Sequence, residues 1–552
     1  MSALSEVPDD QNHEDEPQAP ERSAGAQMTL AAIIISAFGL LGKVLGYGKE
    51  ILIAKWWGRS SAVDAFVVVY KFIVNQLYTK FEKLLRPTYL PIFVEHRTEG
   101  EEEAAWRFFG IVTTLVALVT GALTVVGIIW APQIIRIGWP ALEMPALAAS
   151  LLRVSSAAVL LMVLSVMAEL TLHSHKQFTI PALADATRQF VLFGAIGGLV
   201  GLGVYPASEP RGLMAAAIGV LLGGAARLLV QVPAIWKRMT HFYLSLDTGN
   251  SDVRRMFRLL PPVVVGLVFS LARSYFDSRF GTHAGEGVVS ALNYGRMLAE
   301  LPGLVLPLAV SLVVYPFVSE WASRQDKKRL ADSLVAMTRA MAFIFVPLAL
   351  AMIVLARPIV ATAFERGEFG PEDTTAVTKA LVPYSAGVPF FAVEASINKW
   401  YFALHDTATP NYVGAAMAVL HILIAGAGVY ALNRSIGVIA AALSISKGLK
   451  VILLYALLRK RIGAIDRAAV MSFLGRLLIA TAIMIAVVIG IERGLAPVLM
   501  TGGTLMRLIF LAVVGVSGVG VYLVAAWALR IEEVGMVVGY VRKKLAKKFG
   551  GR

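Results

Sequence analysis

Charged side chains stand inside several long apolar stretches of this sequence, where they are the residues best placed to do chemistry. An ionisable group at the centre of a membrane costs about 2.5–3.5 kcal/mol, so it is expected to face a cavity or a partner. Lys and Arg are the usual partners of phosphate groups. We therefore predict a substrate site for an anion, made of these cations and one acid: Lys43, Lys49, Asp64, Lys71, Lys80, Arg273, Arg279 and Arg296.

Two acids among these cations are predicted to couple the substrate to movement of the protein. Asp277 lies four residues after Arg273, a spacing that lets the two side chains pair on a helix. An arriving anion would compete with Asp277 for the guanidinium group, and Glu300 is assigned the same coupling role. A permanent structural pair is the alternative for Asp277 and Arg273.

The elements that must position these residues are membrane-spanning helices. The 552-residue chain is 57% hydrophobic and 16% charged, with a mean hydropathy of +0.69, whereas soluble domains carry about 25% charged residues. A soluble enzyme, a disordered scaffold and a disulfide-rich secreted domain are therefore excluded. The absence of cysteine also excludes thiol catalysis and thiolate metal sites.

The apolar segments and their breaks predict an all-α, polytopic membrane protein with about fourteen transmembrane helices. These helices are expected to form two six-helix lobes and a C-terminal pair. The predicted spans are residues 28–57, 62–95, 108–133, 145–173, 179–203, 211–236, 256–281, 286–320, 330–356, 374–404, 408–432, 436–459, 467–491 and 503–529.

Five regions follow from this division of the chain. They are a disordered acidic tail (1–27), an N-lobe (28–240), a C-lobe (250–460), a pair of C-terminal helices (466–530) and a basic amphipathic cytoplasmic tail (531–552). An internal repeat supports the two lobes, because the same spacing separates Lys71 from Pro91 and Arg296 from Pro316.

The loop cations predict that both termini are cytoplasmic. If the N-terminus lies inside, the inner loops hold most of the Lys and Arg residues, and the outer loops hold few. The inner clusters are Lys237, Arg238, Arg254, Arg255 and Arg258; Arg324, Lys327, Lys328 and Arg329; and Arg459, Lys460, Arg461 and Arg467. The net charge of +14 therefore reflects membrane orientation, and no nucleic-acid partner is expected.

No catalytic, metal or cofactor site is predicted. His173 and His175 lie at a helix end without a third ligand nearby. The sequence has no Walker A motif and no carboxylate pair at a spacing that suggests glycosyl transfer. The chain is therefore expected not to be an enzyme and to need no cofactor.

Several motifs resemble the MviN/MurJ family of lipid II flippases. In the first part of the chain they are Gly42-Lys43-Val44-Leu45-Gly46 with Lys49-Glu50, Val63-Asp64-Ala65-Phe66, and Tyr89-Leu90-Pro91-Ile92-Phe93. Later motifs are Lys176-Gln177-Phe178-Thr179-Ile180-Pro181-Ala182, Asn293-Tyr294-Gly295-Arg296 with Glu300-Leu301-Pro302, Phe364-Glu365-Arg366-Gly367-Glu368-Phe369, and the stretch from Tyr401 to Pro410. The motifs occur in the same order as in that family, and the resemblance covers residues 30–465.

This resemblance implies the fold of the multidrug/oligosaccharidyl-lipid/polysaccharide exporter superfamily, a V-shaped pair of six-helix lobes. Helices 13 and 14 would add a groove for a lipid tail. The implied function is alternating-access transfer of the undecaprenyl-diphosphate-linked peptidoglycan precursor, lipid II, from the inner to the outer leaflet of the bacterial inner membrane. The implied partners are this glycolipid, membrane lipids and cell-wall synthesis proteins.

Three alternatives stay open at this point. The chain could be a flippase for another polysaccharide precursor. It could also be a drug/cation antiporter, although such a protein would favour acids over cations in its cavity. Finally, it could be a non-transporting assembly scaffold that keeps the transporter fold.

Overall fold

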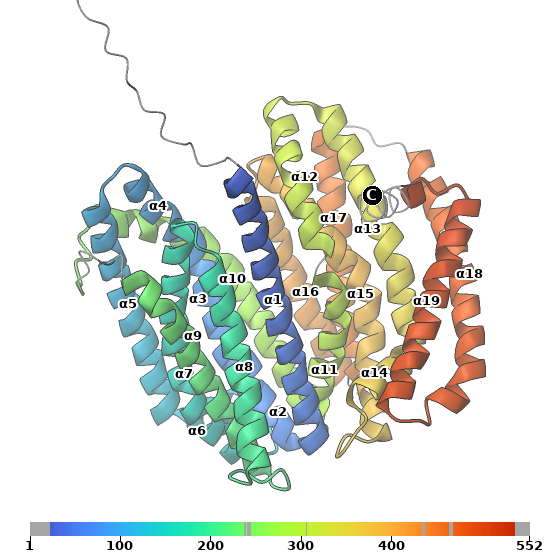
Figure 1. Ribbon diagram of the computed structural model, residues 1–552, viewed down its shortest axis with the longest axis horizontal. Coiled ribbons are helices and arrows are strands. Elements are labelled where there is room, and N and C mark those ends of the chain that lie inside the picture. The colour runs from blue at the N-terminus through green and yellow to red at the C-terminus, as the bar shows by residue number, and fades with distance from the viewer. Residues whose placement is uncertain are drawn as a thin grey trace, which may run out of the picture.

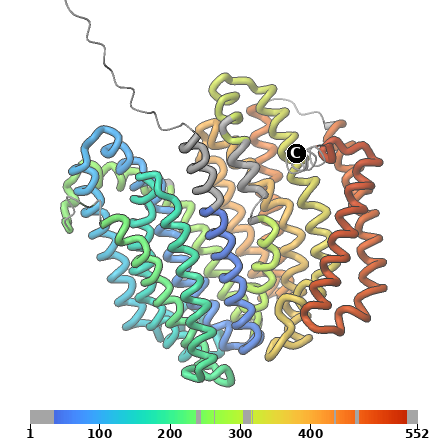
Figure 2. Tube along the Cα trace, in the orientation of Figure 1, coloured from blue at the N-terminus to red at the C-terminus, as the bar shows by residue number. Residues whose placement is uncertain are grey.

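The computed structural model describes residues 22–236, 239, 244–304, 306–432, 436–462 and 467–535 of the chain. These residues form helices and the turns between them, and no strand occurs among them. Most of the helices stand side by side along one common direction (Figures 1 and 2). The predicted all-α class is therefore confirmed.

The first part of the chain forms a group of helices that we call the N-terminal bundle. Its elements are α1 (Arg22–Trp57), α2 (Ser61–Val67), the π-helical turn η1 (Val68–Val74), α3 (Asn75–Thr88), α4 (Leu90–Thr98), α5 (Glu102–Ile129), α6 (Ala131–Gly138), α7 (Pro145–Ser174), α8 (Thr179–Gly201), the 3-10 turn η2 (Pro210–Leu213) and α9 (Met214–Trp236). Helix α8 packs between α1 and α9, and α7 packs on α5 and α9.

The next group, which we call the C-terminal bundle, carries a further pair of helices at its edge. Its elements are α10 (Ser251–His283), α11 (Val288–Glu300), the 3-10 turn η3 (Leu301–Leu304), α12 (Leu306–Ser323), α13 (Lys327–Val354), α14 (Ala356–Phe364), α15 (Pro371–Ala403), α16 (Ala408–Tyr430) and α17 (Ile436–Ile462). The added pair is α18 (Arg467–Leu499) and α19 (Thr504–Ala528), which packs on α13 and α14 at the right of Figure 1.

Each predicted span falls on helices, but two spans that were expected to be continuous are broken in their interior. The spans 108–133 and 330–356 also run past helix ends, at Trp130 and Leu355. The span 62–95 contains the π-helical turn and a break at Tyr89, before Pro91 starts a new helix. The span 286–320 is interrupted by η3, which contains Pro302 and Gly303. Proline lacks the backbone N–H that a continuing helix needs, so both breaks have a local cause.

The ends of the chain differ from the prediction in detail. Helix α1 begins at Arg22 rather than at residue 28, so residues 22–27 of the predicted disordered tail are helical. Residues 1–21 of that tail, and residues 536–552 of the predicted basic tail, lie outside the described residues.

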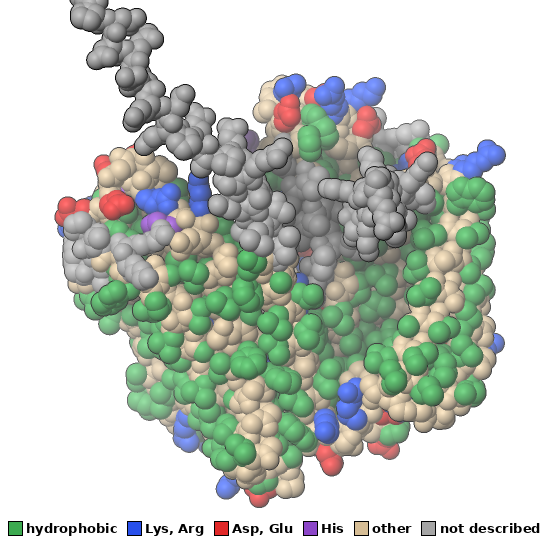
Figure 3. Space-filling model, viewed as in Figure 1, with side chains coloured by type: hydrophobic (Ala, Val, Ile, Leu, Met, Phe, Trp, Pro, Cys, Tyr) green, Lys and Arg blue, Asp and Glu red, His purple; other side chains and the backbone are tan. Residues whose placement is uncertain are grey.

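Within the described ranges, ten helices are long and apolar enough to cross a membrane, or eleven if the bent α10 counts as one span. The polytopic membrane class is therefore confirmed, and the count of about fourteen spans stays a prediction. Hydrophobic side chains cover the middle of the face shown in Figure 3, and charged side chains gather at its two ends. A lipid bilayer requires this distribution.

A network of ion pairs around a buried arginine connects helices within the N-terminal bundle. The side chain of Arg227 on α9 is fully buried and donates to Glu169 of α7 at 2.6 Å and to Asp185 of α8 at 2.8 Å. It also donates to the Ser165 hydroxyl at 2.7 Å and lies 5.2 Å from the ring centre of Tyr78 on α3. One guanidinium group thus ties four helices together.

We expect Arg227→Gln to destabilise the protein strongly, because it removes this cation from the buried carboxylate of Glu169. Loss of one member of a buried ion pair costs about 3–5 kcal/mol. The measurement is the free energy of unfolding of the purified protein in detergent micelles. Arg153→Gln, at an exposed position of α7, is the control, with an expected change within about 0.5 kcal/mol. Equal destabilisation by both substitutions would contradict the assignment.

Candidate functional site

Hydrogen bonds between the two bundles close one end of their interface. The backbone N–H of Ser290 on α11 donates to the carboxylate of Asp64 on α2 at 2.7 Å. Arg59, between α1 and α2, donates to Asp373 of α15 at 3.2 Å and to the carbonyl of Glu286 at 2.8 Å. We call this group of contacts the interbundle seal; it lies at the lower end of Figure 1, near α2 and α14.

Two glycines allow the backbones in the seal to approach each other closely. Gly287 and Gly367 have positive φ angles of 69° and 62°, which side-chain-bearing residues rarely adopt. A Cβ atom on Gly287 would overlap the carbonyl oxygen of Arg59, and one on Gly367 would overlap that of Lys55. The seal is therefore a tight backbone contact as well as a set of ion pairs.

Further along α11 lie three adjoining chambers, which we call the cationic cavity. The first is lined by both bundles, and the second and third are lined by the C-terminal bundle. The chambers have volumes of about 190, 410 and 190 Å³. The first and second share Arg296 and Glu300, and the second and third share Arg273 and Lys447. The other polar or charged lining residues include Lys71, Asn75, Gln76, Ser274, Asp277, Asn293 and Tyr384 in the first chamber, Glu394 and Asn398 in the second, and Ser270, Asn411, Ser446 and Lys450 in the third.

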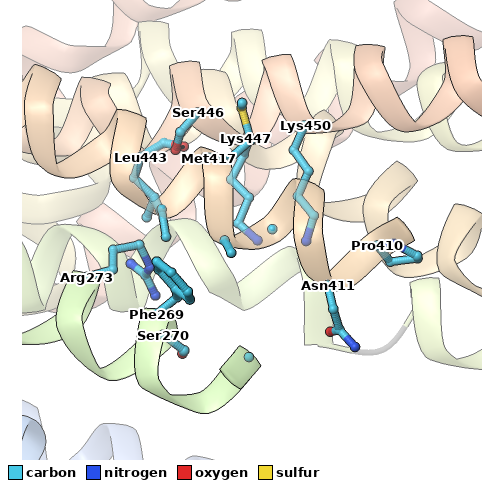
Figure 4. Close-up of a pocket in the computed structure, with 14 residues that line it drawn as sticks. Phe269, Ser270, Arg273, Pro410, Asn411, Met417, Leu443, Ser446, Lys447 and Lys450 are labelled. Carbon is cyan, nitrogen blue, oxygen red and sulfur yellow. Dashed lines mark hydrogen bonds between the residues drawn. The ribbon is translucent and has the colours of Figure 1, made fainter. Parts of the chain in front are cut away.

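The third chamber gathers cations from two helices (Figure 4). Lys447 and Lys450 extend from α17 toward the side where α10 carries Arg273. Both ammonium groups contact the carboxylate of Glu394 on α15, at 2.5 and 2.6 Å. One carboxylate is thus shared by two lysines, which leaves the chamber with an excess of positive charge.

The cavity brings together five of the residues predicted from the sequence: Lys71, Arg273, Asp277, Arg296 and Glu300. Arg273 donates to Asp277 at 3.2 Å, and Arg296 donates to Glu300 at 2.7 Å. Lys71 differs from them, because no carboxylate of the described residues is hydrogen-bonded to its ammonium group. It is the cation of the cavity that is most available to a ligand.

Two of the other predicted residues belong to the sealed end. Asp64 lies in the interbundle seal, as described above. Arg279 donates to the carbonyl of Gly138 at the end of α6, at 3.1 Å, and to the Tyr275 hydroxyl at 2.7 Å. Its guanidinium group thus joins α10 to the N-terminal bundle and lines none of the three chambers.

The three remaining lysines are spread along the N-terminal bundle. Lys49 is buried, pairs with Glu50 at 2.7 Å and lies 4.7 Å from the ring centre of Tyr70. Lys80 donates to Ser270 of α10 at 2.9 Å, next to the third chamber. Lys43 is exposed on α1 and lines none of the three chambers.

Sequence reasoning missed Lys447, Lys450 and His421, and it gave Glu394 no role. The two lysines stand in the apolar segment 436–459, so the rule that selected Lys71 and Arg296 would also have selected them. His421 lies in a segment that otherwise has no charge in its middle, and its importance depends on a contact with Asp277. No sequence pattern reveals that contact.

An ion-paired histidine lies at the opposite end from the seal. His96, in the last turn of α4, contacts Glu101 at 2.8 Å and Asp252 at the start of α10 at 3.0 Å. Partial burial lowers the pKa of this imidazole, but its hydrogen bonds to the two carboxylates outweigh burial and raise the pKa above the usual value. His96, Glu99 and Glu101 could reach one metal ion, but both ring nitrogens of His96 are already held by carboxylates.

Comparison with known protein families agrees with the motifs in the sequence. The family model described as lipid II flippase MurJ matches residues 53–510. The lipid II flippase MurJ of Burkholderia cenocepacia is 26% identical over 442 residues, which cover 78% of this chain and 84% of that protein.

Solved structures show the same fold. A lipid II flippase MurJ in an inward closed conformation aligns with a TM-score of 0.72 and 22% identity, over 90% of this chain and 98% of that one. An inward-facing multidrug resistance transporter of the MATE family and MOP superfamily aligns with a TM-score of 0.64 and 13% identity, over 78% of this chain and 98% of that one. Since the family model covers most of the chain, this protein belongs to the MurJ family of lipid II flippases.

Proposed function

We propose that this protein is a transporter that moves lipid II from the inner to the outer leaflet of the bacterial inner membrane by alternating access. The observation that carries the proposal is a cavity lined by Lys and Arg inside a bundle of membrane helices. Family membership supports lipid II as the substrate. Its diphosphate is the group that a cationic cavity would hold.

The charge balance of the cavity favours an anion over a cation. Its carboxylates, which include Asp277, Glu300 and Glu394, are all engaged by cations of the protein. Lys71 has no such partner among the described residues, and Arg273 and Arg296 can exchange a carboxylate for a phosphate. A cationic drug would be repelled here, so the antiporter alternative is disfavoured.

The proposed orientation puts the interbundle seal on the outer side and both chain termini in the cytoplasm. The loop cations support this, because two cation clusters lie at the end away from the seal: Arg254, Arg255 and Arg258 at the start of α10, and Arg459, Lys460 and Arg461 in the last turn of α17. The structure would then correspond to an outward-closed state. Transport would require the seal to open while the cavity closes on the other side.

The pair α18–α19 is proposed to hold the polyprenyl tail. Its inner face packs on α13, where the Tyr522 hydroxyl donates to the carbonyl of Phe343 at 2.7 Å. Figure 3 shows a recess beside this pair with hydrophobic side chains around it. An apolar recess next to a cationic cavity matches a lipid with a charged head and a long hydrocarbon chain.

The predicted site residues take different parts in this proposal. Lys71, Arg273 and Arg296 would contact the diphosphate, and Lys80 would lie beside them. Lys49 would stabilise the interface through Glu50, whose carboxylate also accepts from Asn293 of α11 at 3.2 Å. Asp64 and Arg279 would hold the sealed end. A substrate contact for the exposed Lys43 stays a prediction.

We expect Lys71→Gln to reduce flipping of lipid II by about 10–100-fold, because hydrogen bonds to charged groups contribute about 1.5–3 kcal/mol. The fold should be preserved, because no carboxylate bonded to Lys71 would lose its partner. The measurement is the initial rate of lipid II translocation in proteoliposomes that contain the purified variant.

Two further variants complete this experiment. Arg153→Gln removes an exposed cation from α7 and should flip at the wild-type rate. Lys43→Gln tests whether that exposed lysine also contacts the substrate. A wild-type flipping rate for Lys71→Gln would show that the cavity does not hold the diphosphate.

A disulfide across the interbundle seal should stop transport. The chain has no cysteine, so an introduced pair is unambiguous. We choose Ser61 and Glu286, which contact each other across the two bundles: their side-chain oxygens lie 2.7 Å apart. We expect Ser61→Cys with Glu286→Cys to crosslink under oxidation and to lose flipping, and a reductant should restore the activity.

The control is a pair within the N-terminal bundle. The Thr124 hydroxyl of α5 donates to the carbonyl of Ser156 on α7 at 3.1 Å, and these helices should move together. Thr124→Cys with Ser156→Cys should therefore leave flipping unchanged after oxidation. Full activity with the seal crosslinked would refute alternating access through this end.

A further inference from the structure

A buried histidine–carboxylate pair lies between α10 and α16. His421, in the middle of α16, is 1% exposed, and its Nε2 atom is 2.5 Å from one carboxylate oxygen of Asp277. The other oxygen of Asp277 accepts from Arg273 at 3.2 Å. Asp277 is therefore shared by an imidazole and a guanidinium group.

The free nitrogen of this imidazole is a vacant site for a proton. A carboxylate accepts hydrogen bonds, so Nε2 carries the hydrogen of the neutral ring, and Nδ1 carries a lone pair. Nδ1 is buried and has no hydrogen-bond partner within the described part of the chain. A proton added at Nδ1 would create an imidazolium ion directly against Asp277.

The pair adjoins the cationic cavity from two sides. Asp277 lines the first chamber, and Met417 and Ala418, one turn before His421, line the third chamber together with Arg273 (Figure 4). The titratable and charged side chains of the chambers around the pair are Lys71 on η1, Arg273 on α10, Arg296 and Glu300 on α11, Tyr384 and Glu394 on α15, and Lys447 and Lys450 on α17. Most of these are cations, which already favour an anion nearby.

We infer that His421 and Asp277 form a proton-binding site that controls whether Arg273 is available to the anion. With His421 neutral, Asp277 holds Arg273. When a proton from water forms the N–H bond at Nδ1, the imidazolium neutralises Asp277, and Arg273 can turn to a phosphate in the second or third chamber. The inference rests on the proposed function, because it assumes that the cavity binds a diphosphate.

Linkage fixes the sign of the effect. If proton binding favours anion binding, then anion binding must take up protons to the same extent. The affinity for a diphosphate should therefore rise as the pH falls. For one linked proton, the affinity changes by at most about tenfold per pH unit.

The test is calorimetric titration of the full-length protein in nanodiscs with inorganic pyrophosphate at pH 6, 7 and 8. Buffers of different ionisation enthalpy report the number of protons taken up per pyrophosphate bound. We expect wild-type protein to take up close to one proton more than His421→Gln, whose amide can still donate to Asp277. Subtracting the proton uptake of the variant from that of the wild-type protein cancels the protons that pyrophosphate itself exchanges.

Two further variants test whether His421 and Asp277 form the proton-binding site. Asp277→Asn should release Arg273 at every pH, so it should bind pyrophosphate tightly and lose the histidine-dependent proton uptake. His283→Gln changes an exposed histidine at the end of α10 and should keep the wild-type pH dependence. These two variants also keep the test valid if His421→Gln does not fold.

Each result decides the inference. Equal proton uptake by wild-type protein and His421→Gln would overturn it, as would wild-type protein that does not bind pyrophosphate or takes up no protons beyond those of the probe. Flipping of lipid II in proteoliposomes separates this outcome from failure of the proposed function. Normal flipping without linked protons refutes only the inference, whereas linked protons without flipping refute only lipid II as the substrate.

Discussion

The structure depends on one constraint: a charge inside a membrane needs an opposite charge or a polar cavity. Most of the internal cations meet it with a carboxylate from a neighbouring helix or turn. Arg227 binds Glu169 and Asp185, and Lys447 and Lys450 share Glu394. These ion pairs determine which helices must lie side by side. A purely apolar interface would specify the neighbouring helices less closely, because lipid chains compete equally well for apolar helix faces.

The same constraint explains why the helices at the bundle interface are irregular. The π-helical turn η1 contains Lys71, and the 3-10 turn η3 follows Glu300 directly. Irregular backbone at membrane depth is tolerated where it faces protein or a polar cavity, because its polar groups must be satisfied. The helices that face lipid, such as α5 and α19, are uninterrupted and carry exposed hydrophobic side chains.

The sequence was sufficient to predict the helices, the cations and the pairing of Arg273 with Asp277 on one helix, but not the pairs between helices. Hydropathy located the helices because burial in lipid acts on every residue separately. The spans 62–95 and 286–320 were predicted to be continuous, but they are broken at Tyr89 and at η3, where a proline stands inside a long apolar stretch. Asp64 and Arg279 were expected in the substrate site and lie at the seal, since the depth of a residue along a helix does not say which neighbour it faces. His421 shows the same limit, because its role depends on a residue far away in the sequence.

Helix α11 connects the seal to the cavity. Its first turn contributes Ser290 to the seal, and Asn293, Arg296 and Glu300 follow on the side that faces Glu50 and the first chamber. Six residues of helix separate Ser290 from Arg296, which corresponds to about 9 Å. A helix transmits a displacement over this length nearly rigidly, and the break at η3 frees its other end from α12. An anion bound to Arg296 would therefore act on the same rigid element that holds Asp64. If its interaction energy differs between the sealed and open states, it would shift the balance between them.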